Sequence, residues 1–245
     1  MGGPVLHRLP PSRYLSAVPS RSTTRPAVLL DLDGTLTDSV YQHAIAWCKA
    51  LELAGISLSV WRIHRRIGMS GGLLAESLAR ETGHELTENE AAKLRQDHAR
   101  LFAAQLADVR PLPGAKDLMR HLTRMKVPWA IATSGALASA GPLLQLVDVP
   151  SGVPIITRDD VEHAKPNPDL WLAGAARLGV PPESAIAVGD SVWDLLAARR
   201  ARALGVGVLS GGYGQEELER AGAYRVYEDP ADLLLHIDEL GIRAG

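Results

Sequence analysis

The sequence predicts an α/β protein: a parallel β-sheet core with helices on both faces, plus an inserted all-helical domain. Three observations support this prediction. Short apolar runs recur along the chain and end in polar residues, helical patterns lie between most of these runs, and one long helical block follows the first run. Strands that alternate with helices build βαβ units, in which the strands are parallel and the sheet is covered on both faces.

The predicted strands are continuous apolar runs, as expected for strands that are buried on both faces. The first is AVLLDLD at 27–33, and the later ones are WAIATSG (129–135), VPIITRDD (153–160), SAIAVGD (184–190) and VGVLSGG (206–212). Ligands of such sheets bind at the carboxyl ends of the strands. The polar residues that end these runs are therefore the candidate functional residues.

The core helices are predicted at 114–126, 137–147, 168–178 and 192–203. Pro113-Gly114 and Pro181-Pro182 separate elements, because Pro and Gly interrupt regular structure. The helical block at residues 40–108 has no strand pattern, and Thr87 with Glu90 forms an S/T-x-x-E capping box before its last helix.

These patterns divide the chain into three parts. Residues 26–39 and 109–245 are expected to form the core, and residues 40–108 a second, smaller helical domain. Residues 1–25 are expected to be a disordered basic tail, because they are rich in Pro and Ser and contain four arginines and no acid.

Composition excludes several classes of protein. The chain of 245 residues is 46% hydrophobic with a net charge of -2, which excludes a disordered chain and gives no basic field for nucleic acid. No apolar run approaches the length of about 18 residues that a membrane helix needs, and Cys48 has no partner for an internal disulfide. We expect a cytoplasmic protein, a monomer or homodimer, that binds neither nucleic acid nor membrane.

Four carboxylates, one ammonium group and two hydroxyls are expected to meet at one edge of the sheet: Asp31, Asp33, Thr133, Ser134, Lys165, Asp190 and Asp194. Crowded carboxylates raise each other's pKa, and a divalent cation removes this conflict. Hard oxygen ligands with room for water suit Mg²⁺, and a lysine suits a phosphoryl group. Two aspartates two residues apart on a strand face the same way, so one can attack phosphorus while the other moves a proton.

Four motifs at these strand ends resemble, in order, those of the haloacid dehalogenase-like (HAD) superfamily. They are DLDGTLTDS (31–39), ATSG (132–135), KPNP (165–168) and GDSVWD (189–194). The resemblance covers about residues 27 to 240. It implies a Rossmann-like core and, at residues 40–108, the helical cap of the phosphoglycolate phosphatase-like and β-phosphoglucomutase-like branch.

The resemblance also implies catalytic and metal-binding roles. Asp31 resembles the nucleophile that becomes an aspartyl-phosphate, and it is also expected to bind Mg²⁺. Asp33 resembles the general acid and base, and its backbone carbonyl resembles one that binds the metal. Asp190 is similar to the metal-binding acid of the fourth motif. Asp194 is similar to its second acid, which is either a ligand or a partner that holds a metal-bound water.

Phosphate binding is expected from a second set of residues. Gly34 frees the backbone to approach an anion closely. Thr133 resembles the hydroxyl that holds the transferring phosphoryl group. Ser134 stands beside it, where relatives often have Asn. Lys165 resembles the lysine that neutralises charge.

The leading interpretation is a Mg²⁺-dependent phosphatase that acts on a small-molecule phosphate ester, and the alternative is a sugar phosphomutase of the β-phosphoglucomutase type. Asp33 argues against dehalogenases, which do not need this second acid. It also argues against phosphonate hydrolases, which lack an Asp at this position. YQHAIAW (41–47) resembles the start of the mutase cap, but Gly71 follows Gly68-Met69-Ser70 where mutases carry an arginine. A binding module without activity is a third possibility, against which the intact acids argue.

Three residues of the helical block are further candidates for contact with substrate. His43 lies about one turn into its first helix, where similar proteins place polar groups at the hinge. Arg65 and Arg66 precede GMSGG (68–72), and one of them is expected to reach a distal anion of the substrate when the cap closes.

Overall fold

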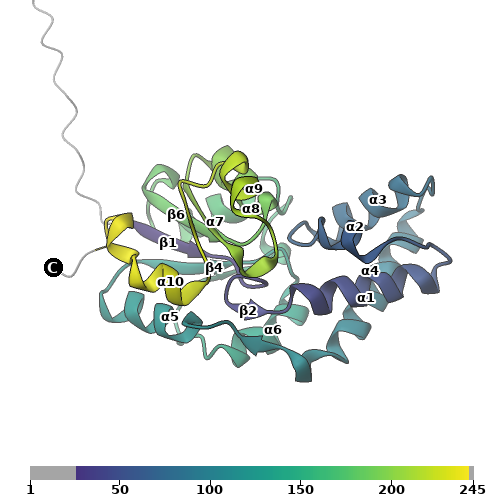
Figure 1. Ribbon diagram of the computed structural model, residues 1–245, viewed down its shortest axis with the longest axis horizontal. Coiled ribbons are helices and arrows are strands. Elements are labelled where there is room, and N and C mark those ends of the chain that lie inside the picture. Colours follow the sequence, from purple (N-terminus) through teal and green to yellow (C-terminus); the bar gives the residue numbers. More distant parts are fainter. Residues whose placement is uncertain (1–25, 243–245) are drawn as a thin grey trace, which may run out of the picture.

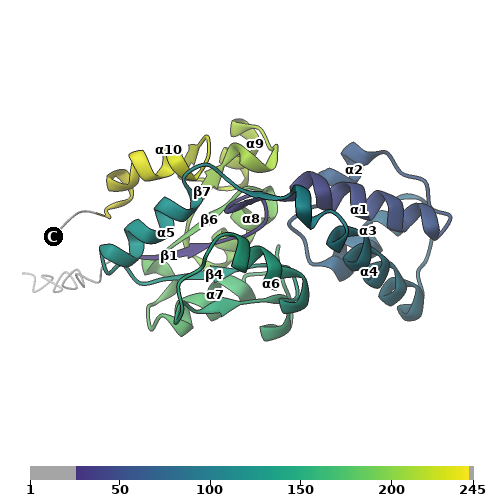
Figure 2. The same ribbon diagram turned by 90° about the horizontal axis from the view of Figure 1, so that it is seen from below.

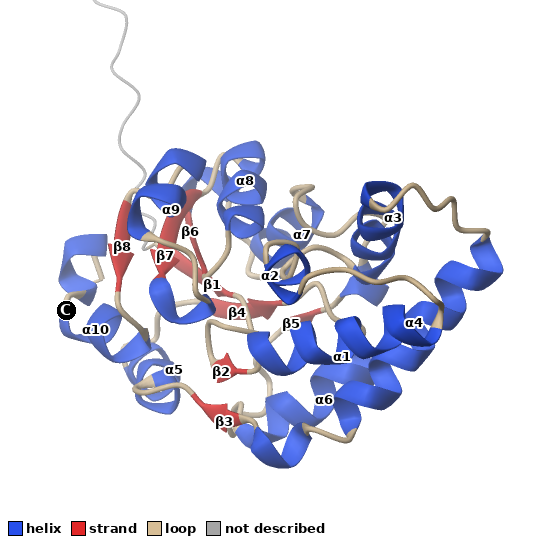
Figure 3. Ribbon diagram, turned by 45° about the vertical axis from the view of Figure 1, so that its right-hand side comes forward, coloured by secondary structure: helices blue, strands red, loops and turns tan. Residues whose placement is uncertain are grey.

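The computed structural model describes residues 26–242, so the expected tail at residues 1–25 lies outside the described part. Within that part, six parallel strands form one sheet in the order β5-β4-β1-β6-β7-β8, and all six are labelled in Figure 3, whereas Figure 1 shows the sheet within the whole molecule. The strands are β1 (Ala27–Leu30), β4 (Trp129–Ala132), β5 (Ile155–Ile156), β6 (Ala185–Gly189), β7 (Leu204–Val208) and β8 (Arg225–Tyr227). The first strand in the chain therefore lies inside the sheet, between β4 and β6.

Helices cover both faces of the sheet (Figure 2). Residues of α5, α6 and α10 pack on one face, and residues of α7 and α8 pack on the other. The helices of the core are α5 (Ala115–Arg124), α6 (Leu137–Leu146), α7 (Asp169–Arg177), α8 (Val192–Ala201), α9 (Gln215–Ala221) and α10 (Pro230–Leu235). This arrangement confirms the predicted fold class.

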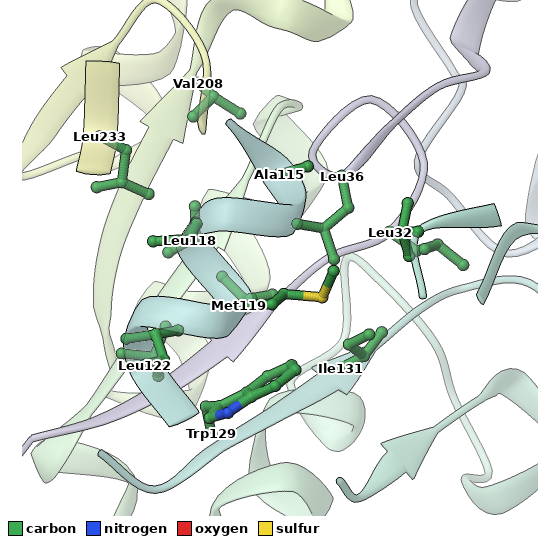
Figure 4. Packing of buried hydrophobic residues seen from close by; sticks show 14 of the residues in the cluster. Leu32, Leu36, Ala115, Leu118, Met119, Leu122, Trp129, Ile131, Val208 and Leu233 are labelled. Carbon is green, nitrogen blue, oxygen red and sulfur yellow. The ribbon is translucent and has the colours of Figure 1, made fainter. Parts of the chain in front are cut away.

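Strand β1 is apolar throughout because its side chains alternate between two cores. Val28 and Leu30 belong to the core on one face, whereas Leu29 belongs to the core on the other. In Figure 4, Leu118, Met119 and Leu122 of α5 point from their helix toward the sheet and lie near Ile131 and Trp129 of β4, which belong to the same cluster.

A second group of helices lies beside the core and is inserted between β1 and β4 in the sequence (Figures 1 and 3). We call this group, α1–α4, the cap. Two short antiparallel strands, β2 and β3, connect it to the core. The bounds are β2 (Thr37–Asp38), α1 (Val40–Leu53), α2 (Val60–His64), α3 (Gly71–Glu81), α4 (Glu88–Ala103) and β3 (Arg110–Pro111). The predicted capping box of Thr87 and Glu90 is present at the start of α4.

The structure differs from the sequence-based expectation mainly in its short elements. The sequence analysis did not predict helices α2, α9 and α10 or strand β8, each of which has seven residues or fewer. Such short segments are stabilised by packing rather than by their own periodicity. The predicted strand at 153–160 is reduced to Ile155–Ile156, because Thr157 and Asp160 form a capping box that begins a 3₁₀ turn. No described helix is both long and apolar enough to cross a membrane.

Gly114 allows α5 and α10 to approach each other closely. It caps α5 with a φ of 72°, and a Cβ atom there would lie 2.4 Å from Cα of Ala231 in the first turn of α10. Gly179 has a similar φ of 69° but has no neighbouring atom within 4 Å of such a Cβ. A substitution at Gly179 would therefore cause backbone strain alone, whereas the same substitution at Gly114 would cause backbone strain and a steric clash with α10.

We expect Gly114→Ala to destabilise the protein more than Gly179→Ala does. Left-handed backbone strain of about 1–2 kcal/mol applies to both variants, whereas only Gly114→Ala also pushes two helices apart, at a further cost of about 1–3 kcal/mol. Urea unfolding of the two variants measures the difference. Equal losses of stability would show that α5 and α10 do not depend on this contact.

Candidate active site

The strand order brings the predicted residues together at one edge of the sheet. Asp31 follows β1, Thr133 follows β4 and Asp190 follows β6, and these three strands are neighbours. The N–H of Asp31 continues the ladder by donating to the carbonyl of Val188 at 2.9 Å. Each side chain leaves its strand at the point where regular pairing ends, so the three converge on one site.

Lys165 lies in the centre of this site, with only 1% of its surface exposed. Its Nζ atom forms ion pairs with Oδ1 of Asp31 and, at 2.7 Å, with Oδ1 of Asp194. It also donates to the carbonyl of Ala132 at 3.0 Å and lies 4.3 Å from the ring centroid of Trp171. The lysine thus connects the ends of β1 and β4 with helix α8.

Burial and mutual repulsion dominate the electrostatics of the carboxyl groups. Burial raises the pKa of Asp31, Lys165 opposes this shift, and the charges of Asp194 and Asp33 add to it. The resulting pKa of Asp31 is about 8. Burial and the charges of Asp194 and Asp31 likewise raise the pKa of Asp190 well above its ordinary value. Burial alone would lower the pKa of Lys165, but Asp194 and Asp31 hold it above its ordinary value. One ammonium group therefore does not balance the carboxylates around it.

The same carboxylates fit a divalent cation. Asp31, Asp190 and Asp194 each offer one oxygen, and these oxygens lie within 4.8 Å of one another. Oδ1 of Asp194 is buried, and its partner among the described residues is the ammonium group of Lys165 at 2.7 Å. An all-oxygen set of this charge is typical of sites for hard cations. The carboxylate of Asp33 is not part of this group, so its expected metal contact would come from its backbone carbonyl.

Gly34 lets the loop after β1 lie against Asp190. Its φ is +78°, and a Cβ atom there would lie 2.6 Å from the Asp190 carboxylate. Its N–H donates to the carbonyl of Thr37 at 2.8 Å. The N–H of Gly34 is thus used within this turn, and the expected close approach of the Gly34 loop to an anion stays a prediction.

Asp33 is held by the segment that leads into the cap. Its Oδ1 atom accepts hydrogen bonds from the hydroxyl of Ser39 at 2.6 Å and from Nε2 of His43 at 3.0 Å. Burial opposes ionisation, but the charge and hydrogen bond of His43 and the hydrogen bond of Ser39 hold the pKa of Asp33 below its ordinary value. Sequence reasoning missed Ser39, although a Ser directly before a helix was the available signal.

His43 is itself supported by a second histidine, His98 of α4. The two rings join through Nδ1 of His43 and Nε2 of His98 at 3.0 Å. Phe102 stacks on His43 with centroids 3.7 Å apart, and Trp47 stacks on His98 at 4.2 Å. Burial lowers the pKa of His98 well below its ordinary value, so this ring is neutral. The contact depends on how α1 and α4 pack, and the sequence alone gave no signal for His98.

Thr133 and Ser134 follow β4 but have different partners. The buried Thr133 accepts the N–H of Gly135 at 3.0 Å with its Oγ1, which leaves its hydroxyl proton available to an anion. Ser134 donates its hydroxyl to the carbonyl of Gly68 in the cap at 3.0 Å. Its hydroxyl therefore connects core and cap in this structure, and the expected contact of Ser134 with phosphate stays a prediction.

The structure does not bring Arg65 and Arg66 to the substrate cavity. Arg65 pairs with Glu217 of α9, and its guanidinium lies 4.0 Å from the ring centroid of Tyr213. Arg66 pairs with Glu81 and donates to Ser77 at 2.8 Å within the cap. Both guanidinium groups are engaged with other residues of the protein in this structure, so a contact with a distal anion, which stays a prediction, would require them to leave these partners.

A cavity of about 740 Å³ lies between the cap and the carboxyl ends of the strands. Asp31, Asp33 and Thr133 line its inner end, and His43, Ser134 and His98 also face it. Two arginines that sequence analysis did not select, Arg95 and Arg158, line it as well. The arrangement can hold an anionic group beside a buried carboxylate nucleophile and a second carboxylate that moves protons.

Known proteins with related sequences carry the same architecture. Residues 26–202 match the family described as haloacid dehalogenase-like hydrolase. The chain belongs to this family. Hexitol phosphatase A from Escherichia coli is 32% identical over 66% of this chain and 73% of that protein, and β-phosphoglucomutase from Bacillus subtilis is 29% identical over 86% and 92%.

A solved structure extends the comparison. The crystal structure of a hydrolase from Pseudomonas syringae has a TM-score of 0.86 and 50% identity, and the match covers 88% of this chain and 99% of that one. Together with the phosphatase and mutase relatives, this places the chain in the phosphoglycolate phosphatase-like and β-phosphoglucomutase-like branch of the HAD family. The resemblance drawn from the four motifs is confirmed.

The raised carboxyl pKa values predict how stability depends on pH when chelator is present. Asp31 and Asp190 keep protons in the folded state that the unfolded chain releases above about pH 4. The folded state binds more protons, so the free energy of unfolding falls as the pH rises from about 4 to about 8. A cation that binds the ionised carboxylates reverses this loss.

Thermal melting at about pH 6 and about pH 8 measures this linkage, with EDTA or with added Mg²⁺. We expect Mg²⁺ to raise Tm more at the higher pH. Asp190→Asn should reduce both the pH dependence and the effect of Mg²⁺. An equal effect of Mg²⁺ at the two pH values would contradict the proposed cause.

Proposed function

We propose that the chain is a Mg²⁺-dependent phosphatase that hydrolyses a small phosphorylated metabolite through an aspartyl-phosphate intermediate. The observation that carries this proposal is the position of Asp31. Its carboxylate is buried at the end of β1 and paired with Lys165. One of its oxygens lies within 4.8 Å of an oxygen of Asp190 and an oxygen of Asp194, so the three could share one metal ion. A nucleophile, a charge-neutralising lysine and a hard-cation site at one point suit phosphoryl transfer.

The carboxylates, with the Asp33 carbonyl implied by the family pattern, would hold Mg²⁺. The ion would neutralise charge on the phosphoryl group and on the carboxylates that surround it. Lys165 would hold one oxygen of Asp31 in place, and Thr133 would donate its hydroxyl proton to a phosphoryl oxygen. Most of the rate enhancement would come from this positioning and charge stabilisation.

Two steps account for the reaction. In the first, an oxygen of Asp31 bonds to phosphorus, the ester P–O bond breaks, and Asp33 gives its proton to the leaving alkoxide. In the second, Asp33 takes a proton from water, the water oxygen bonds to phosphorus, and the bond from phosphorus to Asp31 breaks. A phosphate dianion beside Asp33 raises its pKa, which supplies the acid form for the first step.

The closed cap would keep bulk water out during these steps. In the structure the cap is tied to the core on several sides: Ser134 binds the Gly68 carbonyl, and the N–H of Ser70 donates to the carbonyl of Lys165 at 3.3 Å. His64 also donates from Nε2 to the carbonyl of Gly211 at 2.8 Å. Release of product would require these contacts to open.

We expect Asp31→Asn to abolish phosphatase activity while the protein stays folded. Asparagine keeps the shape of the side chain but removes the nucleophile. Hydrolysis of p-nitrophenyl phosphate, with Mg²⁺ or with EDTA, measures activity, and thermal melting checks the fold. Asp38→Asn is the matched control, because Asp38 is an exposed aspartate of β2, seven residues after Asp31. Turnover of Asp31→Asn at the wild-type rate would refute the assignment.

A sugar phosphomutase remains the alternative function, because β-phosphoglucomutase from Bacillus subtilis is among the relatives. Gly71 stands where mutases carry an arginine, and this difference from the mutase pattern favours the phosphatase. We expect β-glucose 1-phosphate with catalytic β-glucose 1,6-bisphosphate to yield inorganic phosphate and no glucose 6-phosphate. Accumulation of glucose 6-phosphate, measured with glucose 6-phosphate dehydrogenase, would establish the mutase instead.

A further inference from the structure

The cavity extends well beyond the reacting carboxylates. Its volume of about 740 Å³ falls in the size range of pockets that take whole small-molecule ligands. Asp31, Asp33 and Thr133 form only its inner end. A substrate that fills the cavity must therefore have a body and a far end, and the groups around that far end would select it.

Two guanidinium groups line the cavity, one from each domain. Arg95 belongs to α4 of the cap, and Arg158 belongs to the 3₁₀ turn that follows β5 in the core. The backbone N–H of Arg158 donates to the carbonyl of Gly135, which fixes this turn beside the loop after β4. A group bound between the two arginines would contact both sides of the closed cavity.

Neither guanidinium is neutralised by the protein. Within the described residues, no carboxylate forms an ion pair with Arg95 or Arg158, and the one side-chain hydrogen bond of Arg158 goes to the carbonyl of Val161 at 2.6 Å. Four of the five other arginines of the cap have carboxylate partners, namely Arg62, Arg65, Arg66 and Arg100, whereas the exposed Arg80 forms no ion pair with a described residue and does not line the cavity. Arg95 instead keeps its full charge facing the cavity.

The packing of the cap places Arg95 at the far end of the cavity. Helix α4 runs toward the hinge, so Phe102 lies nearest the core, His98 one turn farther out and Arg95 about one more turn, or roughly 5 Å, beyond His98. The side chain of Arg95 lies against Gly71, where an added Cβ would be 3.8 Å from its Cδ. His98 reaches Asp33 through His43, and the backbone of Arg95 lies about one helical turn farther along α4 than that of His98.

One acid also lines this part of the cavity. The exposed Asp159 accepts the N–H of Leu137 at 2.9 Å and so caps helix α6. The positive end of the helix partly offsets its charge. Apart from Asp31 and Asp33, the lining of the cavity therefore carries two guanidinium groups and one carboxylate.

We propose that the substrate carries, at the end remote from its phosphoester, a second anionic group that Arg95 and Arg158 bind together. This inference rests on the proposed function and specifies its substrate class: a phosphomonoester with a distal carboxylate or phosphate, separated from the ester by a chain of several atoms. An anion held by one arginine of the cap and one of the core also favours the closed state, because it makes both contacts only when the domains meet.

The test compares two substrates that differ only at the far end. 6-Phosphogluconate and glucitol 6-phosphate share a six-carbon chain and a 6-phosphoester, but the first ends in a carboxylate and the second in a hydroxymethyl group. We expect kcat/KM to be at least about tenfold higher for the acid. A third substrate, glucitol 1,6-bisphosphate, shows whether a distal phosphate is preferred to a carboxylate, and preference for either anion over the alcohol supports the proposal.

Variants assign the preference to the two arginines. Arg95→Gln and Arg158→Gln should each lower the ratio of kcat/KM between acid and alcohol, mainly through KM, and the double variant should bring it close to one. Arg100→Gln is the matched control, because Arg100 lies on the same helix, pairs with Asp97 and does not line the cavity. This control should keep the wild-type ratio.

The outcomes separate this inference from the proposed function. A protein that hydrolyses p-nitrophenyl phosphate but treats acid, bisphosphate and alcohol alike refutes only the distal site. A ratio that survives the double variant also refutes it. If the esters are not turned over, their inhibition of p-nitrophenyl phosphate hydrolysis is compared, and equal inhibition constants refute it. A protein without activity toward any ester refutes the proposed function itself.

Discussion

The buried ammonium group of Lys165 is the interaction on which the rest of the site depends. Asp31 and Asp194 contact it directly. An oxygen of Asp190 lies within 4.8 Å of an oxygen of each of these two carboxylates. Leaving a buried charge unpaired costs several kcal/mol, and one lysine cannot compensate three carboxylates. The excess negative charge must be met by protons or by a cation. The same imbalance that raises the pKa of Asp31 therefore creates the demand for a metal.

The position of β1 inside the sheet couples this charged centre to the cap. The chain leaves β1, delivers Asp31 and Asp33, and enters the cap within ten residues. Ser39 at the hinge and His43 in the first turn of α1 both donate to Asp33. A movement of α1 relative to the core would change the hydrogen bonds of the residue that moves protons. Closure of the cap and the hydrogen bonding of the Asp33 carboxylate are therefore coupled through Ser39 and His43.

The sequence predicted the parts of the site that follow from strand periodicity. Asp31, Thr133 and Asp190 each end an apolar run, and the rule that parallel strands present their carboxyl ends at one edge was enough to group them. Lys165 was grouped with them, and the resemblance of KPNP to the third family motif gave its role. Arg158 ends the predicted strand at 153–160 but was not singled out, and His98 and Arg95 were not found, because their positions depend on how α4 packs against α1 and on the turn after β5. Such contacts between distant segments leave no pattern in a single stretch of sequence.

The arginines of the cap show why charge alone did not locate the residues that face the substrate. Arg65 and Arg66 precede a glycine-rich loop and were the more conspicuous pair in the sequence. In the structure, the carbonyl of Arg65 accepts hydrogen bonds from Trp193 and Tyr213, and its guanidinium pairs with Glu217, so this residue joins cap to core. Arg95 lies on α4, one turn from His98, lines the cavity and forms no ion pair with a described residue. The contacts of Arg65 between cap and core and the proposed contact of Arg95 with a distal anion thus use different arginines, so a change at Arg95 would leave the contacts of Arg65 in place.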